Sequence, residues 1–374
     1  MLTIKSPHAL YELFKKKPPS TLVEFKEKAL VKSANKTTPL AKYMRERNIP
    51  SHKIKILYDN IVRRNEYLER FYQVSLKPAP LTIDHPPMPR RELNNNKFVQ
   101  YKNVIRNMHF FHILQNTKSG IDGIPTFLDV LYDLYQNSVI DYKILTPSAM
   151  HYIEEGRLAS VFSSFYFRAS IMNPYLVYSL NKSVLRGTRV FTPTLGWTSY
   201  LYGFMECDEV VEYVGTDVIP GVCKKTAQFA KENYPKKGCE IYCDPSETFL
   251  KNPGFMKKYK NHFDLVFFSP PYYELEKYPG KLQSILTYGS YKEWLEGYWR
   301  RTIQVCHEVL EKGGKLCYIL SDYGMSHSNY ALVEDMGRIT REYFKRDTTI
   351  PMLNKNVHVT EHRETGEKIC IFIK

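Results

Sequence analysis

Short apolar runs alternate with amphipathic stretches from about residue 158 to residue 374, and this alternation limits the fold more than any other feature. The runs are rich in the β-branched and aromatic residues that favour strands. They are Arg189–Thr192, Glu212–Thr216, Glu240–Cys243, Leu265–Phe268, Lys315–Leu320 and Lys368–Ile373. Between them, Lys224–Tyr234 and Tyr291–Leu310 have the apolar spacing of helices. This order predicts an α/β fold with a doubly wound, mainly parallel sheet, in which ligands bind at the carboxyl ends of the strands.

The first 154 residues show a different pattern of apolar and charged residues. Residues 1–76 show apolar side chains at helical spacing between many Lys and Arg, which predicts a basic, mostly helical region. Residues 77–96 contain five prolines and end in three asparagines, so we expect a linker there. Residues 97–154 return to a helical, aromatic-rich pattern, and residues 155–374 form the predicted α/β domain.

Positive charge is concentrated near the N-terminus. The chain has a formal net charge of +14, and residues 1–100 hold 20 Lys and Arg against 9 Asp and Glu, whereas the other 274 residues hold 33 against 30. This distribution indicates a polyanion-binding region attached to a near-neutral domain. Basicity does not distinguish DNA from RNA, and a solvated basic surface without a partner stays open.

Cysteine spacing and hydropathy indicate the cellular compartment of the protein. None of the seven cysteines forms a Cys-x-x-Cys pair, so we expect reduced thiols and no metal site. No run of about 18 apolar residues predicts a membrane span, and the first residues lack the apolar core of a secretion signal. We therefore expect an intracellular protein that is not secreted and does not enter a membrane.

Polar residues and glycines follow the first three predicted strands. The first strand leads into Thr194-Leu195-Gly196-Trp197, where a glycine lets backbone approach a ligand. Asp217 ends the second strand about 20 residues later, the position of a ribose-binding acid, with a helix cap as the plainer alternative. Asp244 ends the third strand and can accept from an adenine amino group or cap a helix.

The fourth strand ends in Ser269-Pro270-Pro271-Tyr272. An aromatic amine is a poor nucleophile because its lone pair is delocalised into the ring. The Ser269 side chain and the Pro270 carbonyl can accept its two N–H bonds and localise that pair. The two prolines stiffen the loop, and Tyr272 offers a face on which an extruded base can stack. A proline-rich turn with a neighbouring aromatic residue is the alternative.

The segment 264–278, followed by Gln283-Ser284 and residues 290–295, resembles S-adenosylmethionine-dependent DNA amino-methyltransferases of the adenine-N6 and cytosine-N4 type. A group found in bacteriophages and other viruses is the most similar. The resemblance covers roughly residues 155–374 and does not extend to residues 1–150. Arg168–Tyr178 resembles the helix that these enzymes place against the methionine end of the cofactor. The other parts are Gly196-Trp197 and Gly215-Thr216-Asp217, which resemble the cofactor motifs, and Gly313-Gly314-Lys315, which resembles a later turn.

The resemblance implies a Rossmann-like class I methyltransferase fold, S-adenosyl-L-methionine as cofactor and DNA as partner. It implies transfer of a methyl group to adenine N6 or cytosine N4 of a flipped base, in line and without a covalent intermediate. The implied catalytic residues are Ser269, Pro270, Pro271 and Tyr272. The implied cofactor-binding residues are Arg168, Thr192, Thr194, Gly196, Trp197, Asp217, Asp244 and Ser269.

Two departures from the family pattern keep alternatives open. Thr192 stands at the first strand end, where the family usually has an acid, and Thr198-Ser199 replaces a glycine-like continuation. A non-catalytic nucleic-acid-binding or scaffold protein on the same fold is therefore one alternative. An RNA or small-molecule methyltransferase is another, since a fold does not fix its substrate. Serine at position 269 is frequent in cytosine-N4 enzymes, but this correlation does not fix the base. The resemblance also leaves open a homodimer, and a nuclear or virion location in place of the cytoplasm.

Overall fold

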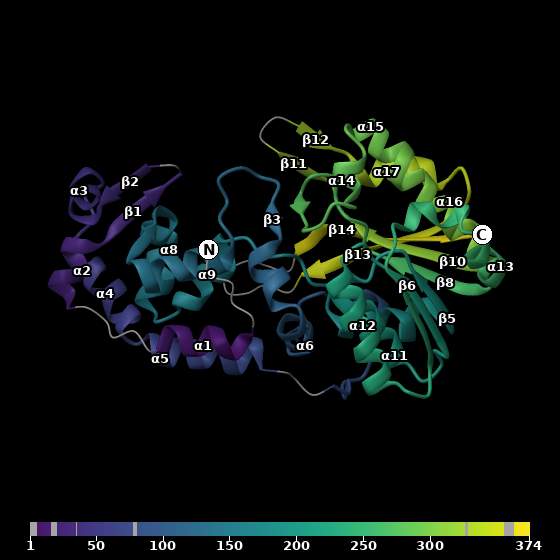
Figure 1. Cartoon of the computed structure of the whole chain (residues 1–374), viewed down its shortest axis with the longest axis horizontal. Helices are drawn as coiled ribbons and strands as arrows, with labels where there is room; N and C mark the ends of the chain where they lie inside the picture. The colour runs from purple at the N-terminus through teal and green to yellow at the C-terminus, as the bar shows by residue number, and fades with distance from the viewer. Residues whose placement is uncertain (1–5, 16–20, 35, 78–80, 326–327, 355–362) are drawn as a thin grey trace. The chain divides into compact units, whose positions relative to one another are not determined.

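The computed structural model describes residues 6–15, 21–34, 36–77, 81–325, 328–354 and 363–374. The chain divides into two compact units (Figure 1). The helical unit comprises Met1–Pro78 and His109–Ser170, and the sheet unit comprises Ala79–Met108 and Ile171–Lys374. We describe each unit by itself.

The sheet unit is built on a seven-stranded sheet whose strand order is β13-β14-β10-β8-β5-β6-β7. Neighbouring strands run parallel except on both sides of β14, which is antiparallel to β10 and to β13. Taken in chain order from β5, the first five strands follow the doubly wound order 3-2-1-4-5. The predicted Rossmann-like class I methyltransferase fold is confirmed. The strands are β5 (Arg189–Thr192), β6 (Glu212–Thr216), β7 (Gly238–Tyr242), β8 (Phe263–Phe268), β10 (Leu310–Leu320), β13 (Lys345–Asn354) and β14 (Arg363–Ile373).

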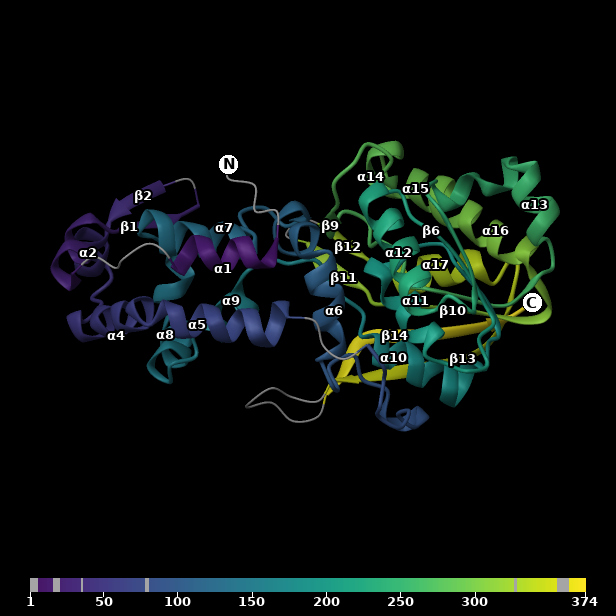
Figure 2. The same cartoon turned by 60° about the horizontal axis from the view of Figure 1, so that its bottom comes forward.

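Helices cover both faces of this sheet. Helices α10, α11 and α12 lie on one face, while α13, α16 and α17 lie on the other (Figures 1 and 2). The central strands are buried on both faces, which explains the continuous apolar run of β8. The remaining elements of the unit are α6 (Tyr101–Met108), α10 (Pro174–Leu180), α11 (Ser199–Met205), α12 (Pro220–Asn233), α13 (Pro253–Tyr259), α14 (Ser284–Thr287), α15 (Tyr291–Trp294), α16 (Arg301–Val309), α17 (Leu332–Thr340), β9 (Glu276–Lys277), β11 (Tyr323–Met325), β12 (Ser328–Tyr330) and the short turns η2 (Arg90–Glu92), η6 (Asn181–Leu185), η7 (Gly196–Thr198), η8 (Ser246–Lys251) and η9 (Leu295–Arg300).

The proline-rich segment that we expected to be a linker, 77–96, is held by the sheet unit over its described residues. The Tyr175 hydroxyl donates to the Pro86 carbonyl at 2.6 Å, and the Met88 N–H donates to Ser179 Oγ at 3.0 Å. Met88 and Leu93 are buried. Because prolines lack an N–H, such a segment forms no regular element of its own, but its carbonyls and apolar side chains still pack. The compact units therefore differ from the predicted boundaries at 76, 96 and 154.

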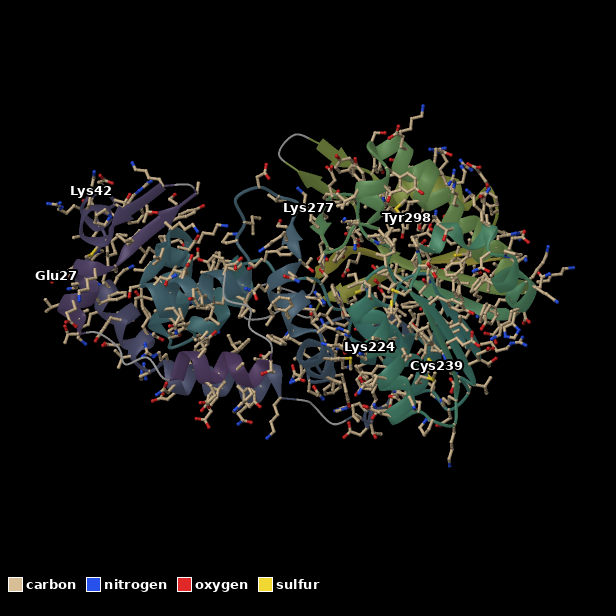
Figure 3. The ribbon with its side chains drawn as sticks, viewed as in Figure 1. Glu27, Lys42, Lys224, Cys239, Lys277 and Tyr298 are labelled. Carbon is tan, nitrogen blue, oxygen red and sulfur yellow. The ribbon has the colours of Figure 1, made fainter. Side chains whose placement is uncertain are left out.

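The helical unit is mostly helical, as its sequence indicates, and also holds a three-stranded sheet in the order β2-β1-β4. Strand β1 runs antiparallel to β2 and parallel to β4. Exposed charged side chains such as Glu27 and Lys42 cover its surface (Figure 3). Its elements are α1 (Pro7–Lys15), α2 (Leu22–Lys28), β1 (Leu30–Ser33), β2 (Lys36–Pro39), α3 (Leu40–Glu46), α4 (Ser51–Val62), α5 (Arg64–Phe71), η1 (Tyr72–Leu76), η3 (His112–Asn116), β3 (Lys118–Ser119), α7 (Phe127–Tyr132), η4 (Asp133–Asn137), β4 (Val139–Asp141), η5 (Tyr142–Leu145), α8 (Pro147–Glu154) and α9 (Leu158–Phe165).

Among the described residues, no helix combines the length and the apolar character that a membrane crossing requires.

Candidate active site

The four strands that carry the predicted site residues are parallel neighbours, so their carboxyl ends meet at one edge of the sheet. In register, Thr192 of β5 pairs with Gly215 of β6, and Thr216 pairs with Tyr242 of β7. Strand β8 lies on the other side of β5. The loops after these strands therefore form one contiguous surface in the sheet unit.

Asp217 follows β6, and its carboxylate reaches towards the loop after β5. Its Oδ2 accepts from the Leu195 N–H at 3.3 Å, and its Oδ1 accepts from the Ile219 N–H at 3.1 Å. Burial raises the pKa of the Asp217 carboxyl to about 6, although these backbone N–H bonds oppose the rise. Each carboxylate oxygen has a second lone pair. The group can thus brace the loop and still accept from a ligand hydroxyl.

The loop after β5 has an unusual backbone. Gly196, Trp197 and Thr198 are all left-handed, with φ of 51°, 60° and 76°. For the two residues that carry side chains this conformation costs free energy, and such strain gathers at functional sites. A Cβ on Gly196 would also collide with the Tyr200 ring, so only glycine fits there.

Thr192 does not face the ligand edge. It is buried, and its hydroxyl forms a 2.6 Å hydrogen bond with the Tyr213 hydroxyl. Beside it, a Cβ on Gly215 would come within 2.6 Å of the Leu195 side chain. Thr192 and Gly215 therefore lie beneath the loop after β5 and support it. The family pattern instead expects an acidic residue at position 192, which would reach a ligand.

Asp244 follows β7 and is exposed. Its backbone carbonyl accepts from Thr216 Oγ1 at 2.5 Å, which ties the ends of β6 and β7 together. Asp244 does not take the helix-cap role that was its alternative. Turn η8 begins after Pro245 without a side-chain cap, and Ser246 Oγ pairs with Thr302 Oγ1 at 3.1 Å. The Asp244 carboxylate is thus presented to solvent at the ligand edge.

Ser269 is held at four points. Its N–H donates to the Tyr200 hydroxyl at 3.1 Å, and that hydroxyl lies 3.4 Å from the Ser269 carbonyl oxygen. The same carbonyl accepts from Thr194 Oγ1 at 3.3 Å. The Ser269 hydroxyl donates to the Ile319 carbonyl on β10 at 2.9 Å. With its only proton used in this way, Ser269 Oγ offers lone pairs to the site and acts there as an acceptor.

Pro270 is buried in the loop after Ser269. Within the described part of the chain, no hydrogen bond uses its carbonyl oxygen. The Pro270 carbonyl oxygen, on the residue after Ser269, is thus a second acceptor that can bond to a ligand.

Tyr272 is anchored by its hydroxyl. The Ser321 N–H donates to Tyr272 Oη at 2.8 Å, and the ring stacks on Tyr323 with centroids 6.1 Å apart. Burial raises the pKa of the Tyr272 hydroxyl, so it stays neutral. The next residue, Tyr273, is buried against Tyr291 and Trp294.

A second cluster joins the loop after β5 to the chain that follows β8. Glu276 is buried and accepts from the Tyr278 hydroxyl at 2.6 Å. The Tyr278 ring contacts the Trp197 indole with centroids 5.9 Å apart. Trp197 is itself buried, so its side chain supports the loop from beneath and leaves its strained backbone to meet a ligand.

Arg168 belongs to the helical unit, whereas the other predicted residues belong to the sheet unit. The helix expected from the resemblance begins later, at Pro174, where the Asn173 side chain accepts from the Tyr175 N–H at 3.1 Å. A cofactor-binding role for Arg168 therefore stays a prediction.

Tyr200 is the main site residue that sequence reasoning missed. It is buried in the first turn of α11, and burial raises its pKa to about 12. The signal was present, because side chains point back along a helix and a residue four positions after Gly196 covers that glycine. An aromatic residue at this spacing predicts a clamp over the turn.

No protein-family model matches the chain, and no curated protein matches its sequence. Solved structures share part of the fold at low identity. TrmN from Thermus thermophilus is 12% identical, with a TM-score of 0.37 over 55% of this chain and 50% of TrmN. The N-methyltransferase NodS from Bradyrhizobium japonicum in complex with S-adenosyl-l-homocysteine is 12% identical, with a TM-score of 0.34 over 53% of this chain and 82% of NodS. A methyltransferase from Pyrococcus furiosus is 17% identical, with a TM-score of 0.35 over 54% of this chain and 82% of that protein.

Proposed function

We propose that the sheet unit is an S-adenosylmethionine-dependent methyltransferase that modifies an exocyclic amino group, adenine N6 or cytosine N4, in DNA. The observation that carries this proposal is the hydrogen bonding of Ser269. Its hydroxyl donates to the Ile319 carbonyl, and its backbone is clamped by Tyr200 and Thr194. A serine held in this way presents fixed lone pairs, which is what an amino group needs from its acceptor.

The residues at the ligand edge fit the cofactor. Asp217 keeps free lone pairs for the two ribose hydroxyls, and the exposed Asp244 can accept from the adenine amino group. Gly196 has no side chain to block the approach of a ligand to the loop backbone. S-adenosylmethionine, when bound, supplies a methyl group on a positively charged sulfur.

Ser269 and Pro270 prepare the nucleophile. Ser269 Oγ and the Pro270 carbonyl accept the two N–H bonds of the target amino group. This pulls the nitrogen towards tetrahedral geometry and localises its lone pair. The prolines at 270 and 271 fix φ, so the acceptors do not reorganise during the reaction. The thiols of Cys306 and Cys317 are buried and have raised pKa values, and the proposed reaction uses neither as a nucleophile.

Tyr272 supplies a stacking face for a base turned out of the duplex. Its hydroxyl bond to Ser321 and its contact with Tyr323 fix the ring. An anchored ring loses little conformational entropy when a base stacks on it, and base–aromatic stacking contributes about 1–3 kcal/mol. The surplus of positive charge in residues 1–100 supports a nucleic acid as the substrate.

A methylation assay tests the proposal. The full chain is incubated with labelled S-adenosylmethionine and with duplex DNA, single-stranded DNA or RNA, and the products are digested and identified as nucleosides. We expect N6-methyladenine or N4-methylcytosine from DNA, while label in RNA alone would move the substrate to RNA. Tyr272→Ala should lose about tenfold or more in rate. Tyr272→Phe keeps the ring and should lose little.

A non-catalytic nucleic-acid-binding protein is the second candidate. Two observations favour it: the Thr192 hydroxyl is buried against Tyr213, and both oxygens of Asp217 already accept backbone N–H bonds. On this account the hydrogen bonds at the strand ends only stabilise the fold. The protein would then hold DNA without binding S-adenosylmethionine or its demethylated product.

A further inference from the structure

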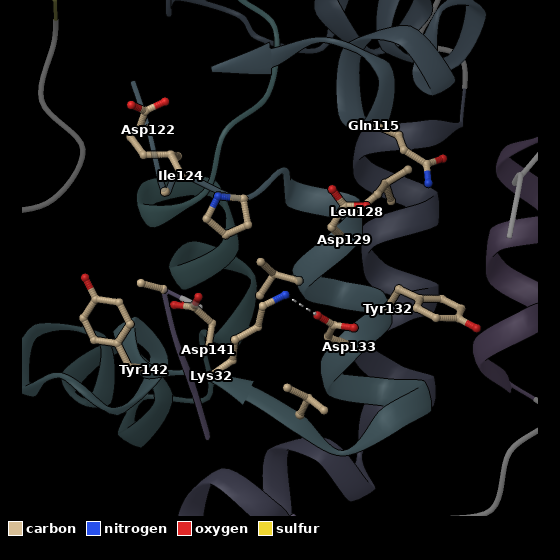
Figure 4. A pocket seen from close by; sticks show the side chains of 15 residues that line it. Lys32, Gln115, Asp122, Ile124, Leu128, Asp129, Tyr132, Asp133, Asp141 and Tyr142 are labelled. Carbon is tan, nitrogen blue, oxygen red and sulfur yellow. Dashed lines mark ion pairs between the residues drawn. The ribbon is translucent and has the colours of Figure 1, made fainter. Parts of the chain in front are cut away.

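Two groups of titratable side chains lie outside the residues assigned above. The first lines a cavity in the helical unit, where three of the four aspartates already bond to side chains of the same unit, as Asp133 does to Lys32 (Figure 4). This acidic lining by itself identifies no ligand. The second is a pair of thiols in the sheet unit, Cys223 and Cys243, at the edge where β6 and β7 end.

Cys243 directly follows β7. Of the seven cysteines, all within the described part of the chain, it is the one that is exposed. The ring of the preceding residue, Tyr242, packs against Phe249 and against Phe255 of α13. Successive side chains along an extended chain point to opposite faces of a sheet. The Cys243 side chain is therefore directed to the other face, which α12 covers.

Cys223 lies on α12 and is only 6% exposed. Its thiol donates to the Asp217 carbonyl at 3.4 Å, and its sulfur lies 3.6 Å from the Tyr242 carbonyl oxygen. The Cys243 thiol lies within hydrogen-bonding reach of it. Burial raises the pKa of the Cys223 thiol, so this thiol stays protonated. An exposed thiol and a buried thiol thus lie side by side.

We propose that Cys243 and Cys223 form a site of reversible oxidation that takes hydrogen peroxide and ends in a disulfide between them. Cysteines that respond to peroxide are solvent-accessible and lie beside a second thiol that resolves the first product. Here Cys243 meets the solvent and Cys223 is the resolving thiol.

The reaction has two steps. The Cys243 thiolate attacks one peroxide oxygen, the O–O bond breaks, and the other oxygen leaves as hydroxide and becomes water. Cys243 then carries a sulfenic acid. The Cys223 sulfur attacks the Cys243 sulfur, the S–O bond breaks, and the hydroxide leaves as water with the thiol proton of Cys223. The two thiols lose two electrons in total, which the peroxide gains.

The disulfide has a consequence for the neighbouring carboxylates, and this part rests on the proposed function. Cys243 immediately precedes Asp244, and the Cys223 thiol bonds the Asp217 carbonyl. In the disulfide the Cys223 sulfur has no proton, so that hydrogen bond is lost. Oxidation therefore alters the backbone beside both residues that are proposed to bind the cofactor, and it should weaken cofactor binding.

Peptide mapping by mass spectrometry, after treatment of the full, reduced chain with hydrogen peroxide, tests the site. We expect the loss of two of the seven thiols, peptides joined through Cys223 and Cys243, and full reversal by dithiothreitol. Cys243→Ser should form no disulfide, and in Cys223→Ser the Cys243 sulfenic acid should persist and oxidise further. Cys239→Ser is the matched control, because it removes a half-buried thiol of β7, and it should still form the disulfide.

Three results would overturn the proposal: wild type that keeps all its thiols, Cys243 oxidised to sulfinic acid beside a reduced Cys223, or a disulfide that joins two chains through Cys243. Calorimetry with S-adenosylhomocysteine tests the consequence. We expect about tenfold weaker binding to the oxidised form, within the usual range of coupling between sites, and no effect of peroxide on the affinity of Cys243→Ser. Equal affinities of both forms would overturn the consequence. Absence of binding to either form would instead refute the proposed function and leave the thiol pair in place.

Discussion

Ser269 illustrates how a common residue acquires a specific chemical role from its neighbours. A free serine hydroxyl rotates and both donates and accepts. Here its proton is directed to the Ile319 carbonyl on β10, and Tyr200 and Thr194 hold its backbone. The lone pairs of Oγ are thereby directed by the structure, as the proposed role of Ser269 as acceptor for an amino group requires.

Removing this acceptor should affect the reaction far more than the cofactor. We expect Ser269→Ala to lower kcat about 100-fold, the usual effect of removing one preorganised hydrogen-bonding group from a transition state. S-adenosylhomocysteine affinity should change less than threefold. Ser246→Ala is the matched control, because it removes a buried hydroxyl that pairs only with Thr302 and should leave kcat unchanged. A similar kcat for Ser269→Ala and wild type would exclude Ser269 as the acceptor.

The proposed role of Asp217, together with its raised pKa, predicts a cofactor affinity that depends on pH. Its carboxyl titrates at about 6 in the fold against an ordinary 3.8, because burial disfavours the charged form. Between these pH values the folded chain binds more protons than the unfolded chain. This carboxyl therefore lowers stability as pH rises from 3.8 to about 6, by about 3 kcal/mol in total, and the cost is constant above pH 6.

Ligand hydroxyls that donate to the ionised carboxylate offset this cost. We therefore expect S-adenosylhomocysteine affinity to be constant above pH 7 and to fall by up to about tenfold per pH unit below pH 6. Calorimetry between pH 5 and pH 8 measures it. Asp217→Asn should bind more weakly than wild type and show a flat profile, and the same pH dependence in both proteins would remove Asp217 from the site.

Some site residues could be predicted from the sequence and others could not, for a physical reason. Ser269, Asp217 and Asp244 follow strands directly, and strand ends can be read from local apolar patterns. The spacing of Tyr200 from Gly196 indicates a clamp, but the left-handed turn at residues 196–198 on which it rests could not be predicted, because two of these residues carry side chains. Thr192 ends β5 as expected, but its hydroxyl bonds to Tyr213 on the neighbouring strand, a contact that only the register reveals.

At the scale of elements, the loop between β5 and α11 connects the proposed cofactor-binding residue Asp217 to the proposed catalytic residue Ser269. Leu195 binds Asp217 through its N–H, and Thr194 and Tyr200 bind Ser269. Turn η7 and the first residues of α11 thus hold both halves of the site. A distortion of this one loop should disturb cofactor binding and amine activation together.

Gly196→Ala tests that coupling. The added methyl group meets the Tyr200 ring at a positive φ, so we expect a loss of about 1–3 kcal/mol in the free energy of unfolding and a weaker affinity for S-adenosylhomocysteine. Tyr200→Leu in the same chain should recover part of the stability but not the activity. Gly254→Ala on α13 is the control, because that glycine has no left-handed φ and space around it. Additive effects of the two changes would contradict a contact between residues 196 and 200.

Most strands of the large sheet could be predicted, because each is a short apolar run between turns. Strands β5 and β6 match the predicted bounds, while β8, β10 and β14 begin earlier than expected. Strand β13 was missed because Lys345–Asn354 is largely polar and lacks the apolar pattern of a strand. This segment is a strand because it pairs with β14. The small sheet of the helical unit was missed for the same reason, since β1 depends on β4 more than 100 residues away.

On the scale of the whole molecule, the uneven charge predicts how the protein meets nucleic acid. Lys28 and Lys36 are exposed in the basic N-terminal region. If this region contacts phosphates, Lys28→Ala and Lys36→Ala should each reduce the slope of log affinity against log salt by about 1, uniformly across DNA sequences. Lys257→Ala, an exposed lysine on α13 of the sheet unit, is the matched control and should leave the slope unchanged. An identical slope in all four proteins would exclude these lysines from the DNA contact.

Cofactor binding is the central claim, and calorimetric titration with S-adenosylmethionine and S-adenosylhomocysteine tests it most directly. We predict micromolar binding of both compounds to the full chain at pH 7.5, with at least tenfold weaker binding to Asp217→Ala. Asp208→Ala is the control, because Asp208 lies outside the strand ends, and it should bind both compounds normally. Asp264 is not used for this purpose, because its carboxylate bonds β8 to the start of β5. A folded protein that binds DNA but shows no heat with millimolar cofactor would contradict the account and leave a nucleic-acid-binding protein on a methyltransferase fold.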